Sequence, residues 1–482
     1  MNELVQTENT GVIPPVLQRI HILGVCGTGM AALAGMLKQR GYTVTGSDMN
    51  VYPPMSDFLR ELHIEVKEGY KPENLDPRPD LVVVGNVIRR ENPEAVRMRE
   101  LNIPHVSFPQ ILSKLFIQGR QSVVVCGTHG KTSTSSLMAW ILEYAGRDPS
   151  FMIGGIAKNF MKNYKVGNGG FFVAEGDEYD TAYFDKGPKF LHYQPRHVIL
   201  TSVEFDHADI YRDLDHVKSA FRRLLSIIPD DGFLMACAED KGVADVLRDY
   251  SGKLQTYGLD GSNADWTAEL LSLDKGTTRF LVRREGDIQG EFTAPFYGRH
   301  NMLNGLAAIG LSNHLGLDMD VIGRALSLFQ GVKRRQEVRG VVGGITIIDD
   351  FAHHPTEVRE TVAAVRAAYS AARLIAVFEP RTNTSRQKFF QKDYIESFAG
   401  ADYVLVREPP DPEKFGLDNS FSSKQLSLDI EAKGGQCRSF PRTEEIIDFL
   451  TDLGKPGDVI LIMSNGGFDN IHDRLLAALA AG

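Results

Sequence analysis

The ten residues Val123–Thr132 read VVVCGTHGKT and place an apolar run, a glycine-rich turn and a helix start next to one another. The run Val123–Val125 is short and apolar, which is typical of a strand in a parallel sheet. Gly127 and Gly130 allow a sharp backbone turn, and the N–H groups that open the following helix favour an anion. The segment therefore predicts a phosphate-binding loop in an α/β fold.

The side chains of this loop add charge and an oxygen ligand. Lys131 can place its ammonium beside phosphate oxygens, and the Thr132 hydroxyl can bind Mg²⁺. The pattern departs from GxxxxGK[ST], because Val125 stands where the first glycine would be. The residues predicted to bind the phosphates are Gly127, Thr128, His129, Gly130, Lys131, Thr132 and Ser133.

Acidic residues and a histidine follow the next two predicted strands. Glu175 comes directly after the run 171–174, where its carboxylate is placed to hold Mg²⁺. Asp177 and Glu178, taken individually, would suit a solvated acidic loop. His207 follows the run 197–200 within EFDH. A lone histidine is more often structural, but the neighbouring acids make His207 a candidate second metal ligand.

A second glycine-rich turn, Gly24–Gly29 or GVCGTG, follows the predicted strand Ile20–Leu23. Its spacing is GxxGxG rather than GxGxxG. Asp48 lies about 20 residues further on, where a dinucleotide-binding fold has its ribose-binding acid. The turn predicts a diphosphate at a helix N-terminus. NAD binding and a plain tight turn are the alternatives.

Strand-like runs alternate with helix-like segments along most of the 482 residues, which predicts parallel α/β units. Length suggests about three domains. We place them at residues 1–118, 119–331 and 332–482, with the polar linker Gln118–Gln121 and a hinge near Gly331–Lys333 at the boundaries. Residues 252–297 alternate polar with apolar and are expected to be β-rich.

Composition excludes several classes of protein. The formal net charge of −9 disfavours a non-specific nucleic-acid binder. No apolar stretch is long enough to span a bilayer, and the N-terminus lacks the pattern of a signal peptide. The four cysteines are widely spaced, which favours free thiols in a reducing compartment. We expect a cytoplasmic protein without a membrane partner.

The third block carries its polar residues at strand ends. The segment Asp349–Thr356, DDFAHHPT, follows the run 345–348 and contains two acids and two histidines. Ligands of open parallel sheets bind at this edge. The basic run Lys333–Arg335 is either a solvated hinge or a contact to a nucleotide.

Six motifs occur along the chain in the order GTHGKT, EGDE, EFDH, GRHNMLN, RR and DDFAHHPTE. In this combination the sequence resembles the Mur ligase family, the ATP-dependent amide ligases of peptidoglycan synthesis, from about His21 onward. The resemblance implies a Rossmann-like N-terminal domain, a P-loop central ATPase domain and a Rossmann-like C-terminal domain. It also implies ATP and Mg²⁺ as cofactors.

The resemblance extends to individual residues. Lys131, Glu175 and His207 would be catalytic, and Thr132, Glu175 and His207 would bind metal. ATP would further contact His300, Asn301, Asn304, Arg335 and Asp350. UDP-N-acetylmuramate would contact Gly27, Thr28, Gly29, Ser47, Asp48 and Asn86. The residues assigned to the amine substrate are His354, Arg381 and Ser464.

GVCGTGM followed by GSD is similar to the branch of the family that binds UDP-N-acetylmuramate itself, which removes most of the case for NAD. The acceptor is then either L-alanine or the murein tripeptide L-alanyl-γ-D-glutamyl-meso-diaminopimelate. Four segments resemble the tripeptide branch, and we favour that acceptor: NVYPPM (50–55), FDHADI (205–210), EPRTNT (379–384) and SNGGF (464–468).

Two positions depart from other family members. Phe221 stands where some carry a carbamylated lysine, and Ser202 replaces an asparagine often found before the EFDH segment. The diaminopimelate-selecting DNPR motif is absent. Recognition of diaminopimelate must therefore be built differently here.

The resemblance implies that the lactoyl carboxylate of UDP-N-acetylmuramate attacks the γ-phosphate of ATP, and that the peptide amine then attacks the resulting acyl phosphate. Contributions from three domains imply closure on binding. The rival classes are a NAD-dependent nucleotide-sugar oxidoreductase, which gives GTHGKT no role, and a non-catalytic nucleotide-sugar sensor.

Overall fold

The computed structural model describes residues 10–53, 55–208, 210–409 and 419–481. Pro54 and Asp209, which belong to two of the segments compared above, lie outside the described residues. The chain forms two compact units. The first comprises Met1–Val203, Val217–Thr256 and Gly310–Leu317, and the second comprises Glu204–His216, Tyr257–Ile309 and Asp318–Gly482.

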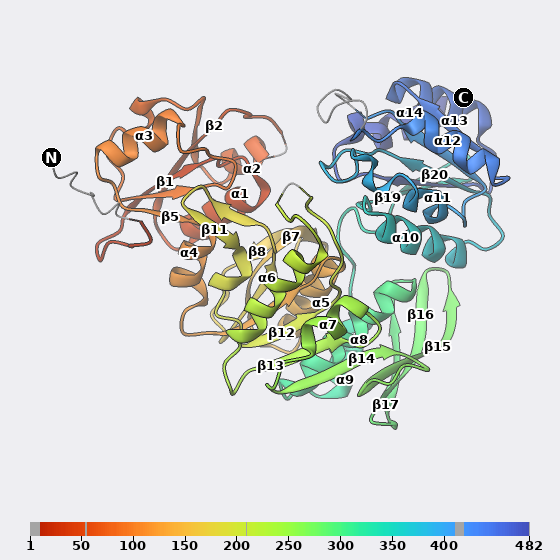
Figure 1. Cartoon of the computed structure of the whole chain (residues 1–482), viewed down its shortest axis with the longest axis horizontal. Helices are drawn as coiled ribbons and strands as arrows, with labels where there is room; N and C mark the ends of the chain where they lie inside the picture. Colours follow the sequence, from red (N-terminus) through yellow and green to blue (C-terminus); the bar gives the residue numbers. More distant parts are fainter. Residues whose placement is uncertain (1–9, 54, 209, 410–418, 482) are drawn as a thin grey trace. The chain divides into compact units, whose positions relative to one another are not determined.

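The first unit begins with a five-stranded parallel sheet of order β3-β2-β1-β4-β5. Its strands are β1 (Arg19–Leu23), β2 (Thr43–Asp48), β3 (Glu65–Glu68), β4 (Leu81–Val84) and β5 (His105–Ser107). The helices of this part are α1 (Thr28–Gln39), α2 (Met55–Glu61), α3 (Pro93–Glu100) and α4 (Phe108–Leu112) (Figure 1). The predicted strand at 20–23 is thereby confirmed.

A second sheet of the first unit carries the phosphate-binding sequence. Its strand order is β13-β12-β6-β9-β7-β8, and only the β7–β8 pair among these is antiparallel. The strands are β6 (Gln121–Cys126), β7 (Ser150–Ala157), β8 (Lys162–Lys165), β9 (Phe171–Gly176), β12 (His197–Leu200) and β13 (Phe233–Cys237). A small hairpin joins β10 (Asp180–Ala182) to β11 (Asp185–Pro188). The helices are α5 (Lys131–Tyr144), α6 (Leu214–Ser226) and α7 (Lys241–Leu247).

The second unit has an antiparallel part and a parallel part. β15 (Trp266–Asp274), β16 (Thr277–Arg284) and β17 (Asp287–Ala294) pair antiparallel, and the end of β14 (Leu254–Leu259) pairs with β15. The expected β-rich segment at 252–297 is confirmed. α8 (Arg299–His314) and α9 (Met319–Ser327) follow.

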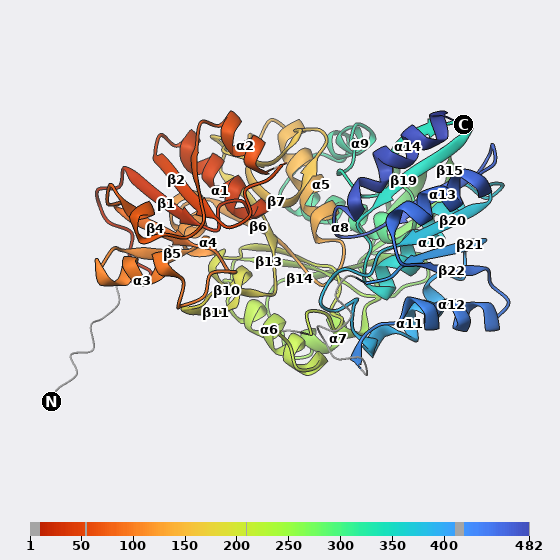
Figure 2. The same cartoon turned by 90° about the horizontal axis from the view of Figure 1, so that it is seen from above.

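The C-terminal sheet has the order β18-β19-β23-β20-β21-β22 and is parallel except at its edge strand β18. The strands are β18 (Glu337–Val342), β19 (Ile345–Asp350), β20 (Leu374–Phe378), β21 (Tyr403–Arg407), β22 (Cys437–Phe440) and β23 (Val459–Met463). Figure 2 shows β20, β21 and β22 following one another across this sheet. The apolar run 345–348, after which the polar segment was expected at a strand end, lies within β19.

Helices cover both faces of this sheet, because its strands are apolar on both sides. Residues of β20 alternate between two cores: Ala376 and Phe378 pack with α10 (Pro355–Ala368), α11 (Asp393–Ser397) and α12 (Ser423–Ala432). Ile375 and Val377 pack with α13 (Thr443–Leu453) and α14 (Ile471–Ala481) on the other face. The arrangement directs the residues that follow each parallel strand to one open edge.

Short helical turns complete the described structure: η1 (Pro72–Leu75), η2 (Ser113–Ile117), η3 (Lys189–His192), η4 (Lys388–Phe390) and η7 (Phe468–Asn470). None of the helices in the described ranges is both long and apolar enough to cross a membrane.

Candidate active site

The glycine-rich loop between β6 and α5 is fixed against the end of β12. Gly127 has φ +129°, and a Cβ there would lie 2.1 Å from the Thr201 hydroxyl, so a larger residue does not fit. Gly130 has φ +79° and caps α5. The backbone N–H groups of Thr128 and His129 donate to the carbonyl and hydroxyl oxygens of Ser202, at 2.9 and 3.0 Å. Ser202 therefore supports the loop.

Lys131 opens α5 and turns its ammonium toward the loop and the neighbouring strand. Its Nζ lies 2.6 Å from the Gly127 carbonyl and 3.0 Å from a carboxylate oxygen of Glu178. Burial opposes the charge, but the nearby carboxylates of Glu178, Asp177 and Glu175 outweigh it and raise the pKa of Lys131. The side chain is thus a fixed ammonium at the start of the helix, with Thr132 and Ser133 next along it.

Thr132 and Glu175 form an oxygen-rich centre beside this lysine. The Thr132 hydroxyl donates to Oε1 of Glu175 at 2.8 Å, and the Gly154 N–H donates to Oε2 at 2.7 Å. Burial, followed by repulsion from Asp177, raises the pKa of Glu175. A partly buried carboxylate whose pKa is raised is stabilised by a nearby cation, and a hydroxyl with a carboxylate is a donor set that suits Mg²⁺.

The acids that follow Glu175 do not form a solvated loop, so that interpretation is wrong. Asp177 pairs with Lys189, with 3.0 Å between Oδ2 and Nζ. Glu178 is 3% exposed and pairs with Lys131. Both carboxylates hold lysines around the phosphate-binding loop, which the spacing in EGDE alone did not indicate.

The N-terminal glycine turn also lies at the end of adjacent strands. The N–H groups of Gly24 and Val25 donate to the Ser47 carbonyl, at 2.9 and 3.1 Å. The Cys26 N–H donates to a carboxylate oxygen of Asp48 at 2.9 Å. Gly27, Thr28 and Gly29 are exposed at the start of α1, and Asn86 is exposed just after β4. The structure brings these predicted residues to one edge of the sheet.

A carboxylate that sequence reasoning missed lies beneath this turn. Glu94, on α3, is fully buried and accepts hydrogen bonds from the Ser47 hydroxyl at 2.7 Å and from His21 Nε2 at 3.2 Å. Its other oxygen accepts from the Asn74 amide at 2.5 Å and from the Lys71 N–H at 3.0 Å. Burial opposes ionisation, but these hydrogen bonds prevail and lower the pKa of Glu94.

The α8 (Arg299–His314) side chains assigned to ATP lie together in the second unit. Asn301 donates to the Tyr297 carbonyl and to the Gln336 side chain, both at 3.0 Å, and Asn304 donates to Asn301 at 3.5 Å. Nδ1 of His300 is buried without a hydrogen-bond partner among the described residues, and burial lowers the pKa of His300 to about 4. His300 therefore offers a neutral imidazole to a ligand.

Gln336, which the sequence did not single out, connects this group to Asp350. Its backbone N–H donates to an Asp350 carboxylate oxygen at 2.8 Å, while its side chain reaches Asn301. Burial raises the pKa of Asp350 to about 6, against the opposing effect of Arg335. The Arg335 guanidinium lies over the Phe351 ring, 4.8 Å from its centre. The structure thus brings Arg335 and Asp350 to the same neighbourhood as the α8 residues.

The EFDH segment belongs to the second unit and lies beside α10. Burial alone would raise the pKa of Asp206, but His207, His353 and His354 lower it to about 2. His354 caps α10: its Nδ1 accepts the Thr356 N–H at 3.3 Å, and its Nε2 lies 3.3 Å from the Phe205 carbonyl. His354 is 5% exposed, and its two ring nitrogens contact Thr356 and Phe205, so the side chain holds the EFDH segment against the start of α10.

Ser464 and Arg381 lie where β23 and β20 end, around a buried glutamate that the sequence did not single out. The Ser464 hydroxyl donates to Oε2 of Glu379 at 2.6 Å. Nη1 of Arg381 lies 3.7 Å from Oε1 of the same carboxylate. The Arg334 guanidinium donates to the carbonyls of Ser464 and Gly466, at 2.6 and 2.7 Å, and so fixes the loop after β23.

Phe221 is the residue predicted to stand where some members of the family that the sequence resembles carry a carbamylated lysine. It is buried on α6 and packs against Phe190, with 5.6 Å between the ring centres. An apolar ring in this packing leaves no place for a carbamylated side chain.

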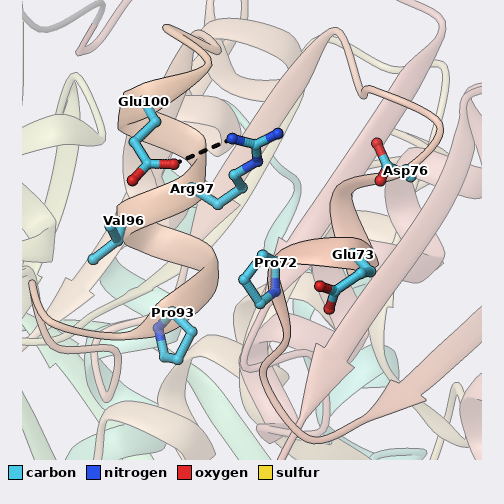
Figure 3. Close-up of a pocket in the computed structure, with 7 residues that line it drawn as sticks. All are labelled: Pro72, Glu73, Asp76, Pro93, Val96, Arg97 and Glu100. Carbon is cyan, nitrogen blue, oxygen red and sulfur yellow. Dashed lines mark hydrogen bonds and ion pairs between the residues drawn. The ribbon is translucent and has the colours of Figure 1, made fainter.

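A surface groove between η1 and α3 lies apart from these residues (Figure 3). An ion pair of 3.2 Å joins Arg97 to Glu100 along its wall. The groove is lined by Pro72, Glu73, Asp76, Pro93, Val96, Arg97 and Glu100. The residues predicted from the sequence to bind substrate do not line it.

Three family models match successive parts of the chain. The model described as Mur ligase family, catalytic domain, matches residues 19–120, the Mur ligase middle domain matches 125–312, and the model described as Mur ligase, glutamate ligase domain, matches 334–466. Together they support the predicted three-domain α/β architecture. The phosphate-binding loop lies in the part that matches the middle domain.

Curated relatives match nearly the whole chain. UDP-N-acetylmuramate--L-alanyl-gamma-D-glutamyl-meso-2,6-diaminoheptandioate ligase of Escherichia coli (strain K12) is 41% identical over 96% of this chain and 98% of its own length. The enzyme of the same name from Haemophilus influenzae is 38% identical over 96% of this chain and 99% of its own length. UDP-N-acetylmuramate--L-alanine ligase of Desulforamulus reducens is 34% identical over 96% and 98%.

Solved structures of related ligases also match nearly the whole chain. A murein peptide ligase from Psychrobacter arcticus 273-4 matches with 36% identity and a TM-score of 0.71, over 96% of this chain and 99% of that one. A UDP-N-acetylmuramate-alanine ligase from Thermotoga maritima matches with 25% identity and a TM-score of 0.79, over 97% and 100%. The sequence motifs, the site geometry and these comparisons agree: the chain belongs to the Mur ligase family.

Proposed function

We propose that this protein is an ATP-dependent ligase that joins the lactoyl carboxylate of UDP-N-acetylmuramate to the amine of L-alanyl-γ-D-glutamyl-meso-diaminopimelate. The observation that carries the ATP chemistry is the centre formed by Lys131, Thr132 and Glu175 at the glycine-rich loop. The 41% identity to a ligase named for this reaction supports the choice of substrates.

The reaction must bring a carboxylate up to the anionic γ-phosphate, so its main barrier is repulsion between two anions. The backbone N–H groups that open α5 and the Lys131 ammonium counter the phosphate charge. Thr132 and Glu175 would hold Mg²⁺, and His207 would hold a second ion; bound Mg²⁺ supplies further charge neutralisation. The carboxylate is then phosphorylated, and the acceptor amine displaces phosphate from the acyl phosphate.

The other predicted residues bind and orient substrates. The turn at Gly27–Gly29, with Ser47, Asp48 and Asn86, holds the diphosphate of UDP-N-acetylmuramate at the start of α1. In the second unit, His300, Asn301, Asn304, Arg335 and Asp350 contact ATP, and His354, Arg381 and Ser464 lie on the amine-substrate side.

The second candidate function is UDP-N-acetylmuramate–L-alanine ligation. It is favoured by the 34% identity to an alanine ligase and by the TM-score of 0.79 to another. The relatives named for the tripeptide reaction are more similar in sequence, at 41% and 38%. A nicotinamide enzyme and a non-catalytic sensor have no support in family matches that run along all three domains.

The four cysteines are free thiols, and the substrates are a nucleotide sugar and ATP. Both features favour action in the reducing cytoplasm.

The test is ADP release in the presence of Mg-ATP and UDP-N-acetylmuramate, with the tripeptide or L-alanine as the acceptor. We expect release with the tripeptide and little with L-alanine. Lys131→Ala should abolish turnover while UDP-N-acetylmuramate still binds, and chelation of Mg²⁺ should do the same. ADP release with L-alanine but not with the tripeptide would show that L-alanine is the acceptor. Near-wild-type rates in Lys131→Ala would contradict the role of the loop in ATP chemistry.

A further inference from the structure

The C-terminal sheet buries a carboxylate where β20 ends. Glu379 is 4% exposed, and its Oε2 accepts the Ser464 hydroxyl at 2.6 Å. Its Oε1 faces the Arg381 guanidinium, whose Nη1 is 3.7 Å away. That separation is too long for a hydrogen bond, so the arginine balances the charge without binding the oxygen closely.

Arg381 is held so that its guanidinium stays available. Its side chain is 47% exposed, and it lies against Gly466 in the loop after β23. A Cβ at Gly466 would come within 2.1 Å of the Arg381 Cδ, so a larger residue there would displace the arginine from its present position. Arg334 holds this loop through the Ser464 and Gly466 carbonyls. One anion and one cation are thus fixed side by side at the sheet edge.

The electrostatics of Glu379 favour a cationic ligand. Burial raises the pKa of Glu379, and only part of this effect is offset by the Ser464 hydroxyl and by Arg381. An ammonium placed at Oε1 would compensate the buried charge. A carboxylate on the same ligand would find a two-pronged donor in Arg381.

The strand order sets the distance of this pair from the ATP side. Asp350 ends β19, and Glu379 follows β20, two strands along in the order β19-β23-β20. Neighbouring strands are about 4.8 Å apart, so the two ends are separated by about 10 Å. Three extended residues span about 10 Å, whereas one spans about 3.5 Å. A tripeptide is therefore long enough to extend from the Asp350 end of the sheet to Glu379, whereas the backbone of a single amino acid is not.

We propose that Glu379 and Arg381 form a receptor for a zwitterionic amino-acid end, with the ammonium at Glu379 and the carboxylate at Arg381. This inference rests on the proposed function. In the proposed acceptor, the matching group is the far end of meso-diaminopimelate, which carries both charges on one carbon. The receptor takes the place of the absent DNPR motif.

The test uses the full-length enzyme and three acceptors: the diaminopimelate tripeptide, the tripeptide with L-lysine in its place, and the dipeptide L-alanyl-γ-D-glutamate. Loss of a charged hydrogen bond predicts that Glu379→Gln raises the KM for the diaminopimelate tripeptide about 10- to 100-fold. Arg381→Gln should raise the same KM but leave the KM for the lysine tripeptide within about threefold, because that acceptor lacks the second carboxylate. The kcat should change little in both variants.

The dipeptide and a surface variant are the controls. Glu431→Gln, an exposed residue of α12, should leave all three KM values unchanged. For the dipeptide, Glu379→Gln and the wild type should have equal KM values. An equal loss with dipeptide and tripeptide would assign Glu379 a structural role and overturn the receptor, as would an unchanged KM for the tripeptide. If the wild-type enzyme releases no ADP with the diaminopimelate tripeptide, the proposed function itself fails, which is a separate result.

Discussion

Two buried glutamates at the edges of two parallel sheets differ in how their charge is satisfied. Glu94, beneath the N-terminal glycine turn, accepts hydrogen bonds from Ser47, His21, Asn74 and Lys71. Glu379, at the C-terminal sheet, accepts a hydroxyl and faces a guanidinium 3.7 Å away. The pKa of Glu94 is lowered below its usual value, and that of Glu379 is raised above it.

The difference separates a carboxylate that serves the fold from one that is suited to a ligand. Burial raises the pKa of any carboxylate, and only enough donors reverse the effect. Glu94 has donors from β1, β2 and the β3–η1 connection, so its charge organises the residues beneath the N-terminal glycine turn. The negative charge of Glu379 is only partly compensated within the folded protein. An ammonium bound beside it would therefore stabilise that charge more than it would stabilise the charge of Glu94.

The largest effect should be on stability. Glu94→Gln places an amide N–H₂ against groups that donate to the carboxylate, and it removes the charge that they stabilise. We expect a loss of about 2–4 kcal/mol in the free energy of unfolding. Glu379→Gln should change it by less than about 1 kcal/mol, since the lost charge was poorly compensated. Urea unfolding of both variants and the wild type measures this, and equal losses would contradict the distinction.

The pH dependence should have opposite signs for the two residues. The lowered pKa of Glu94 means that its stabilising effect is complete above the ordinary value of 4.5 and is lost as the pH falls through the lowered pKa. The raised pKa of Glu379 means that the wild type loses stability relative to Glu379→Gln as the pH rises from 4.5 through the raised pKa. Urea midpoints of the wild type and of each glutamine variant, measured from pH 3 to pH 7, give the two stability differences as a function of pH. Slopes of one sign for both differences would contradict this account.

A smaller effect should follow from the residue that positions the C-terminal loop. Arg334→Lys keeps the charge but removes Nη2, the guanidinium nitrogen that donates to both the Ser464 and the Gly466 carbonyls, and the lysine ammonium ends a shorter side chain. We expect the KM for the tripeptide to rise about three- to tenfold, as the loss of roughly one hydrogen bond predicts. The KM for UDP-N-acetylmuramate should remain unchanged. An equal rise in both constants would indicate a general disturbance of the fold.

The phosphate-binding region was predictable because the residues that form its strand, turn and helix start are neighbours in the sequence. Val123–Val125, Gly127 and Lys131 lie close together in the chain, and the structure builds strand, turn and helix from them in that order. The strand limits of β20 and β23 were predictable for the same reason, since five buried apolar residues stand between polar ones.

The residues that sequence reasoning missed depend on distant partners. Glu94 contacts Ser47 and His21, which are 47 and 73 positions away, and Glu379 contacts Ser464, which is 85 positions away. Gln336 was missed because it joins α8 to β19 through one backbone and one side-chain contact. No local pattern marks such residues, although a glutamate directly after an apolar strand was a usable signal for Glu379, as it was for Glu175.

The most direct measurement is a competition for one activated carboxylate. The enzyme would be given Mg-ATP, UDP-N-acetylmuramate and equal concentrations of L-alanine and the diaminopimelate tripeptide, and the products would be resolved by mass spectrometry. The account predicts the mass of UDP-N-acetylmuramoyl-tripeptide as the main product, with release of one ADP per amide bond formed. UDP-N-acetylmuramoyl-L-alanine as the main product would contradict it.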